Sequence, residues 1–107
     1  MKSIVFLGDS LDAIRSFPDS ARRQAGYQLD KVQRGRAPDD WKPMSSLGPG
    51  VNEIRIQDEG GAFRVIYVAK LEDAIYVLHA FQKKDQRTRK TDLDLAKTRW
   101  QLLKSKR

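Results

Sequence analysis

Three consecutive runs of β-branched and aromatic residues constrain the fold of this 107-residue chain more than any other feature. The runs "VNEIRIQ", "AFRVIYVA" and "AIYVLHAF" occupy residues 51–57, 62–69 and 74–81. The turn-forming stretches "DEGG" and "KLED" separate them. Connections this short join antiparallel neighbours, because a parallel pair needs a long crossover. We therefore predict a three-stranded antiparallel meander in the second half of the chain.

Helical patterns lie on either side of these strands. A short strand at residues 3–7 is followed by helices at residues 8–17 and 18–35, and then by a proline-rich loop at residues 36–50. Helical spacing returns at residues 92–104. We predict an α+β fold in which two N-terminal helices and a C-terminal helix pack on one face of a small antiparallel sheet. The length suits one domain, residues 1–107.

Residues suited to helix ends support these limits. Pro18 fits the first turn of the second helix, and Gly35 fits its end. Candidate N-terminal caps are Asp9 or Ser10 for the first helix and Thr91 or Asp92 for the last. The apolar stripes are Ala21, Ala25, Leu29 and Val32 in the second helix, and Leu93, Ala96, Trp100 and Leu103 in the last.

Positive charge is concentrated at one end of the chain. The formal net charge is +7, and residues 1–82 hold equal numbers of basic and acidic side chains, so the whole excess lies in residues 83–107. Such asymmetry attracts an anionic partner, most commonly a nucleic acid and next an acidic protein. A solvated basic tail without a partner is the alternative interpretation.

Several other functions find little support in the sequence. The chain has no cysteine and one histidine, so we expect no metal site and no cofactor. The glycines at 48 and 50 are not followed by the lysine and helix start of a phosphate-binding loop. The apolar run at residues 4–7 is too short for a signal peptide or a membrane span, and we expect a soluble, cytoplasmic protein.

The meander permits a prediction of side-chain register. If "DEGG" closes symmetrically, Arg55 lies opposite Arg64, and Ile54 opposite Val65 on an apolar face that should meet the helices. If "KLED" closes about residues 71–72, Arg64 also lies opposite His79. Two arginines side by side cost a sheet on the order of 0.2–1 kcal/mol, and a phosphate between them would offset this cost. The alternatives are that both arginines extend into water or that Glu53 neutralises them.

Three further residues have both a functional and a structural interpretation. His79 is either a catalytic group or a hydrogen-bonded structural residue. Phe81 is either a ring on which an RNA base stacks or part of the core. Trp41 is either a hydrophobic plug or, with Lys42, a second stacking and phosphate-binding pair.

Four segments also resemble a known family. "WKPMSSLGPGVNEIRI", "FRVIYVAK" and "AIYVLHAFQKK" are similar to the phage-related HigB-like branch of the RelE toxin superfamily, as is the opening "GDSLDAIRSFPDSARRQAGYQL". The "HAFQKK" segment is the most specific part of the match. Relatives often carry a small hydroxyl residue and a proline where this chain has Asp85 and Arg89.

The resemblance implies a RelE-like fold and the toxin of a type II toxin–antitoxin pair. Such a toxin is a ribosome-dependent mRNA endonuclease that uses the RNA's own 2′-hydroxyl as nucleophile, without metal or cofactor. Its expected partners are the ribosome, mRNA and a cognate antitoxin of helix-turn-helix type, with DNA bound only through the antitoxin and no membrane contact. A non-catalytic RNA- or ribosome-binding module is the alternative.

The resemblance and the register argument together give a candidate site. We expect Arg64, assisted by Arg55, to bear the charge of the phosphate. We expect Lys84 or Lys83 to act as base, and His79 or the other lysine as acid. The RNA-binding candidates are Lys42, Phe81, Arg87, Arg89 and Lys90.

Overall fold

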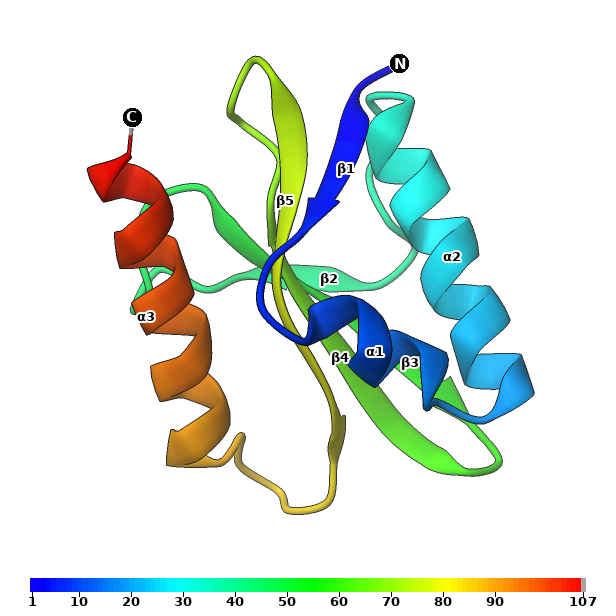
Figure 1. The fold of residues 1–107 in the computed structure, drawn as a ribbon. Coiled ribbons are helices and arrows are strands. Elements are labelled where there is room, and N and C mark those ends of the chain that lie inside the picture. Colours follow the sequence, from blue (N-terminus) through cyan, green and yellow to red (C-terminus); the bar gives the residue numbers. More distant parts are fainter. Residues whose placement is uncertain (107) are drawn as a thin grey trace.

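The computed structural model describes residues 1–106, which form one five-stranded sheet and three helices (Figure 1). The strands are β1 (Ser3–Phe6), β2 (Trp41–Pro43), β3 (Val51–Asp58), β4 (Gly61–Val68) and β5 (Ala74–Lys83). The helices are α1 (Ser10–Arg15), α2 (Asp19–Gln33) and α3 (Lys90–Ser105). The strand order is β1-β5-β4-β3-β2, so the predicted meander β3-β4-β5 forms the centre of the sheet. The α+β class is confirmed.

The outer strands correct the prediction of a purely antiparallel sheet. β1 pairs with β5 in parallel, so the sheet is mixed. This pairing joins segments about 70 residues apart, which short-range turn signals do not reveal. β2 lies within the predicted loop and pairs with β3. A three-residue strand is too short to show alternation, and Pro43 is tolerated there because β2 is an edge strand.

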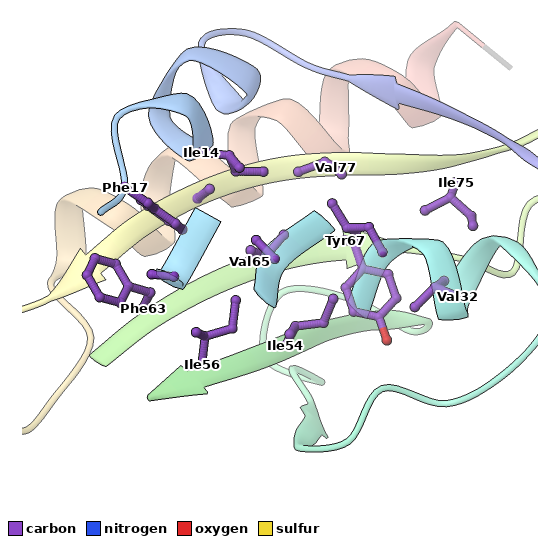
Figure 2. Close-up of a cluster of buried hydrophobic side chains, with 14 residues drawn as sticks. Ile14, Phe17, Val32, Ile54, Ile56, Phe63, Val65, Tyr67, Ile75 and Val77 are labelled. Atoms are coloured by element: carbon purple, nitrogen blue, oxygen red, sulfur yellow. The ribbon is translucent and has the colours of Figure 1, made fainter. Parts of the chain in front are cut away.

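The helices cover both faces of the sheet, so the prediction of a single covered face was wrong. Figure 1 shows α2 on one side and α3 on the other. One core cluster packs α1 and α2 against Ile54, Ile56, Phe63 and Val65, and Figure 2 shows these side chains meeting. A second cluster packs Ala96, Trp100 and Leu103 of α3 against Ile66, Val68 and Leu78. Both predicted apolar stripes are therefore core, although on opposite sides.

The predicted helix ends are confirmed in part. α2 begins directly after Pro18, and at its other end Gly35 has a φ of 80°. The Arg36 and Gly35 amides donate to the carbonyls of Lys31 and Val32, which closes the helix in a Schellman motif.

Among the described residues no helix is long and apolar enough to span a membrane.

The predicted side-chain caps are not formed. Asp9 is the N-cap of α1, but its side chain makes no capping hydrogen bond. α3 begins at Lys90 with Arg89 as its N-cap, so neither Thr91 nor Asp92 caps it. The side chains of Asp9 and Asp92 bond elsewhere, in a network described below.

The predicted register is confirmed between β3 and β4 and wrong between β4 and β5. Arg55 lies opposite Arg64, and Ile54 opposite Val65. In β5, however, Arg64 lies opposite Phe81, and Ile66 lies opposite His79. The turn closes one residue later than assumed, and a bulge at Leu78 adds a second shift. Each shift of one residue reverses the face on which a side chain lies, so two shifts cancel. His79 therefore lies on the same face as Arg64, in the neighbouring row of side chains.

The packing of Trp100 predicts a sharp difference between two glycines. A Cβ atom on Gly48, whose φ is 148°, would lie 2.3 Å from Nε1 of the buried Trp100 ring. We expect Gly48→Ala to lower the free energy of unfolding by about 1–3 kcal/mol. Gly26→Ala is the control, since a Cβ in this exposed turn of α2 meets nothing within 4 Å. It should stabilise by roughly 0.5–1 kcal/mol. Urea unfolding checks both values, and equal effects would contradict the packing.

Candidate nucleic-acid interface

Two adjacent rows of side chains cross the α3 face of the sheet. The first row is Arg55, Arg64 and Phe81, on β3, β4 and β5. The second row is Lys42, Glu53, Ile66 and His79, on β2 to β5. Neighbouring rows on one face are two residues apart along each strand. The fold therefore brings Arg55, Arg64, His79, Phe81 and Lys42 to one face, and only the predicted pairing of Arg64 with His79 is lost.

Arg64 is the central charge of the first row and is only 7% exposed. Its Nε lies 3.6 Å from Oε1 of Glu53, and its Nη1 donates to the Phe63 carbonyl at 3.0 Å. Burial lowers the pKa of the Arg64 guanidinium, and Arg55 lowers it further, whereas Glu53 and Asp40 raise it. The predicted alternative in which Glu53 neutralises the arginines therefore applies to Arg64.

Glu53 does not use its full hydrogen-bonding capacity on Arg64. Its side chain is buried, and in residues 1–106 its Oε2 atom has no hydrogen-bond partner. The 3.6 Å separation from Arg64 is longer than an ordinary hydrogen bond. A guanidinium carries five donors in a fixed fork. The described contacts of Arg64 thus fix its position without using all of these donors.

The Trp41–Lys42 pair does not act as a unit. Lys42 lies opposite Glu53 and so faces the α3 side of the sheet. Trp41 lies opposite Ile54, whose side chain belongs to the core cluster on the α2 side. Successive side chains of a strand point to opposite faces. The hypothesis of a joint stacking and phosphate-binding pair is therefore wrong, because the two side chains point away from each other.

His79 lies in a polar network that joins α3 to the sheet. The ring is 5% exposed, and its Nε2 lies 2.7 Å from Oδ1 of Asp92. Nη1 of Arg99 lies 3.3 Å from its Nδ1 and also donates to the Leu78 carbonyl. Because a guanidinium can only donate, Nδ1 of His79 accepts from Arg99. Nε2 of His79 then carries the hydrogen and donates it in a hydrogen bond to Asp92. Both ring nitrogens are thus engaged in holding α3 in place.

Arg99 extends this network to the start of the chain. Its Nη2 donates to Oδ1 of Asp9 at 2.8 Å, and this bond holds the pKa of the Asp9 carboxyl below its usual value. The role of Arg99 was not predicted from the sequence. A signal was present, because Arg99 is spaced three residues after Ala96 and four before Leu103 on the buried stripe of α3. A charged residue at such a position needs a polar partner.

Phe81 is placed in the core rather than on the surface. Its ring is 8% exposed and belongs to the cluster beneath α3. It stacks on His79 with 5.3 Å between the ring centroids and 20° between the ring planes. The structural interpretation of Phe81 is the one that this packing supports.

The basic residues at the end of β5 and after it are exposed, except for Lys83. Lys83, the last residue of β5, is half-buried and lies opposite Ala62, in the row next to Arg64 and Phe81. Lys84, Arg87, Arg89 and Lys90 are exposed. Asp85 pairs with Arg89 at 2.9 Å and raises the pKa of the Arg89 guanidinium. Asp85 therefore contacts Arg89 and not one of the two lysines.

Two pockets in the described part of the chain lie away from these residues. The larger, of about 840 Å³, is lined by Lys2, Val32, Arg36, Trp41 and Tyr67, at the end of α2. The smaller lies beside the β3–β4 turn. Neither of these two pockets is lined by a residue of the basic face, which we define as the α3 side of the sheet with Lys42, Arg55, Arg64 and Lys83.

Comparison with known proteins places the chain in a family. Residues 12–101 match the model of the phage-derived Gp49-like proteins (DUF891), and the chain belongs to this family. This family is associated with the toxins of toxin–antitoxin systems. A search of curated proteins finds no match.

The network around His79 yields a prediction about stability. We expect Asp92→Ala to lower the free energy of unfolding by about 1–3 kcal/mol, because the buried Nε2–H of His79 loses its acceptor. Asp94→Ala is the matched control, an exposed carboxylate on the same turn of α3. Its effect should stay within roughly 0.5 kcal/mol. Chemical denaturation measures both, and a neutral Asp92→Ala would exclude the bond as a structural tie.

Proposed function

We propose that the protein is the toxin of a type II toxin–antitoxin pair and cuts mRNA on the ribosome. The observation that carries the proposal is the placement of Arg55 directly opposite Arg64 on a sheet face of a Gp49-like protein. Like charges in facing positions destabilise a sheet. Glu53 pairs with Arg64, whereas Arg55 has no ion pair within residues 1–106, so a bound anion beside Arg55 would offset the repulsion. A backbone phosphate of RNA fits, because guanidinium groups bind phosphate oxygens in two-point contacts.

The proposed reaction needs no group beyond the RNA and the protein's side chains. The 2′-oxygen attacks the adjacent phosphorus and the bond to the 5′-oxygen of the next nucleotide breaks, which leaves a 2′,3′-cyclic phosphate. A base removes the 2′-proton, and an acid gives a proton to the departing 5′-oxygen. Negative charge builds up on the phosphoryl oxygens in the transition state, where a fixed cation stabilises it most.

Arg64 is the residue that we assign to this charge. Its guanidinium is held by Glu53 and by the Phe63 carbonyl, so its position is set before RNA binds. A group that needs no reorganisation stabilises a transition state better than a mobile one. Arg55, less buried and directly opposite, would approach the same phosphate from the neighbouring strand.

Lys83 and Lys84 take different roles in this proposal. Lys83 ends β5 on the face of Phe81 and lies in the row next to Arg64, which suits proton transfer. Lys84 lies beyond the strand and is exposed, as are Arg87, Arg89 and Lys90, which suits contacts with the RNA backbone. Lys42, on the other side of the face, would contact a neighbouring phosphate.

His79 acts through position rather than by proton transfer in this scheme. Both of its ring nitrogens are engaged and its ring is buried against Phe81. It would maintain the β5 geometry that presents Lys83. The partners implied are the ribosome, mRNA and a cognate antitoxin, with DNA reached only through the antitoxin.

A non-catalytic RNA- or ribosome-binding module is the second candidate. The burial of Arg64 beside Glu53 favours it, because a satisfied ion pair has a structural role of its own. The same basic face would then bind RNA by charge alone, with the strong salt dependence of phosphate contacts.

The variant Arg64→Lys distinguishes the proposed endonuclease from the non-catalytic binding module. Removal of Arg64 altogether would leave Glu53 as an uncompensated buried charge, so the lysine variant is the safer test. We expect it to bind ribosomes but to cut ribosome-bound mRNA roughly 10²-fold more slowly, because a lysine lacks the two-point contact. Arg23→Lys, on the exposed side of α2, is the control and should cut normally. Primer extension on the mRNA measures cleavage, and thermal unfolding verifies the fold.

If neither the wild-type protein nor Arg64→Lys cuts mRNA on ribosomes while both bind them, the binding module is the correct function. If Arg64→Lys cuts as fast as wild type, Arg64 does not carry the charge of the transition state.

Alanine variants of Lys83 and Lys84 should have different effects on cleavage and binding in single-turnover experiments. We expect Lys83→Ala to lower the cleavage rate at saturating protein by roughly 10²–10⁴-fold, the range for a lost proton-transfer group. Lys84→Ala should chiefly weaken binding and reduce the dependence of affinity on salt by about one phosphate contact. The reverse pattern would assign the proton transfer to Lys84.

A further inference from the structure

The pocket at the end of α2 is a second cationic site, on the opposite face of the sheet from the proposed RNA surface. We call it the α2-end pocket. Lys2, Arg34 and Arg36 stand on its rim, and Val32, Trp41 and Tyr67 form its apolar wall. Figure 2 shows Val32 and Tyr67 together at the end of the core cluster away from Phe17 and Phe63. No aspartate or glutamate of the described chain lines it.

The rim charges are largely uncompensated. Arg34 pairs with Asp30 at 2.9 Å, but no ion pair is found for Lys2 or Arg36 within residues 1–106. Lys2 donates instead to the carbonyls of Ala69 and Leu71, both at 2.8 Å, which fixes the ammonium group without neutralising it. A positive rim of this kind attracts carboxylates.

Nearby acidic residues face away from the pocket or are already paired. Asp39 is held by Lys31 and Gln28, and these bonds lower the pKa of its carboxyl. Asp40 accepts the Arg55 amide and directly precedes Trp41, which faces the α2 side, so alternation puts the Asp40 side chain on the α3 side of the sheet. The pocket therefore keeps its positive character.

The wall of the pocket suits a large apolar side chain. Trp41 is 41% exposed, although the sheet offers it an apolar neighbour in Ile54 on the same face. The Tyr67 ring is buried below, and burial raises the pKa of its phenol to about 12, so the hydroxyl stays neutral and can donate. An exposed tryptophan beside a cationic rim is a common composition for an interface centre.

The edge of the sheet beside the pocket can take an extended chain. β2 has β3 on one side only within the described part of the chain. The Arg55 amide donates to the Asp40 carbonyl and the Met44 amide to the Val51 carbonyl, so residues 40 and 44 face β3. By the alternation of an antiparallel ladder, the backbone amide and carbonyl of Trp41 point outward. Such an edge accepts a strand from a partner.

We propose that the α2-end pocket binds an extended acidic segment of a partner protein, which adds beside β2 and places a large apolar side chain against Trp41. A nucleic acid is the less fitting occupant, because a sheet edge binds another polypeptide backbone through its own amide and carbonyl groups. The inference does not depend on the RNA chemistry, since no proposed catalytic residue lines this pocket. If the toxin proposal holds, an antitoxin is the natural source of the segment.

The test uses a displayed random-peptide library selected on the full-length protein, followed by affinity measurements on the selected peptides. We expect the recovered sequences to combine acidic residues with a large apolar residue. Trp41→Ala and Arg36→Glu should each weaken these peptides at least about tenfold. Tyr27→Ala and Arg23→Glu, an exposed aromatic residue and an exposed arginine of α2 outside the pocket, should leave the affinity unchanged.

Three results would overturn the proposal. The first is the recovery of no acidic binders, and the second is binding that is insensitive to Trp41→Ala and Arg36→Glu in folded variants. The third comes from titration with a short oligouridine: if these two variants weaken RNA binding more than Arg55→Ala does, the pocket is part of the RNA surface. Failure of the peptide experiment leaves mRNA cleavage as an independent question.

Discussion

The buried pair of Arg64 and Glu53 is the interaction on which the candidate site depends. Burial of two charges costs more than their attraction returns unless the geometry is good, and an apolar pair of the same volume is often as stable. Here the separation is 3.6 Å and one carboxylate oxygen lacks a partner in residues 1–106. Such a pair contributes little to stability for its cost. In the proposed site, the pair would instead fix the position of a guanidinium in a partly apolar environment, where its field would act strongly on a bound phosphate.

Sequence patterns predicted the part of the fold that local rules govern. The period of two in residues 51–57 and 62–69, with a tight turn between them, was sufficient to place Arg55 opposite Arg64. The same reasoning failed for β5, because a bulge at Leu78 leaves no mark in a run that is apolar on both faces. The parallel partner β1 and the opposite placement of α3 depend on long-range contacts, which periodicity does not encode.

The candidate site was predictable for residue types and only partly for geometry. Alternation places Arg64 and Lys83 on one face, and the observed register, which differs from the predicted one, puts them in neighbouring rows. Trp41 and Lys42, adjacent in sequence, point to opposite faces because residues 41–43 form a strand that the prolines had concealed. The exposed Trp41 therefore lines the α2-end pocket, whereas Lys42 lies on the face that we propose for RNA.

Helix α3 is held against the sheet by hydrogen bonds in addition to its apolar contacts. Its buried stripe of Ala96, Trp100 and Leu103 is short. Hydrophobic contact alone is non-directional and would permit the helix to slide. The bonds from His79 to Asp92 and from Arg99 to Asp9 and the Leu78 carbonyl are directional. If the helix shifts, the buried His79 ring loses its acceptor on Asp92. The bulge at Leu78 brings His79 into reach of this network. The irregularity that defeated the register prediction is therefore what fixes the helix beside the basic face.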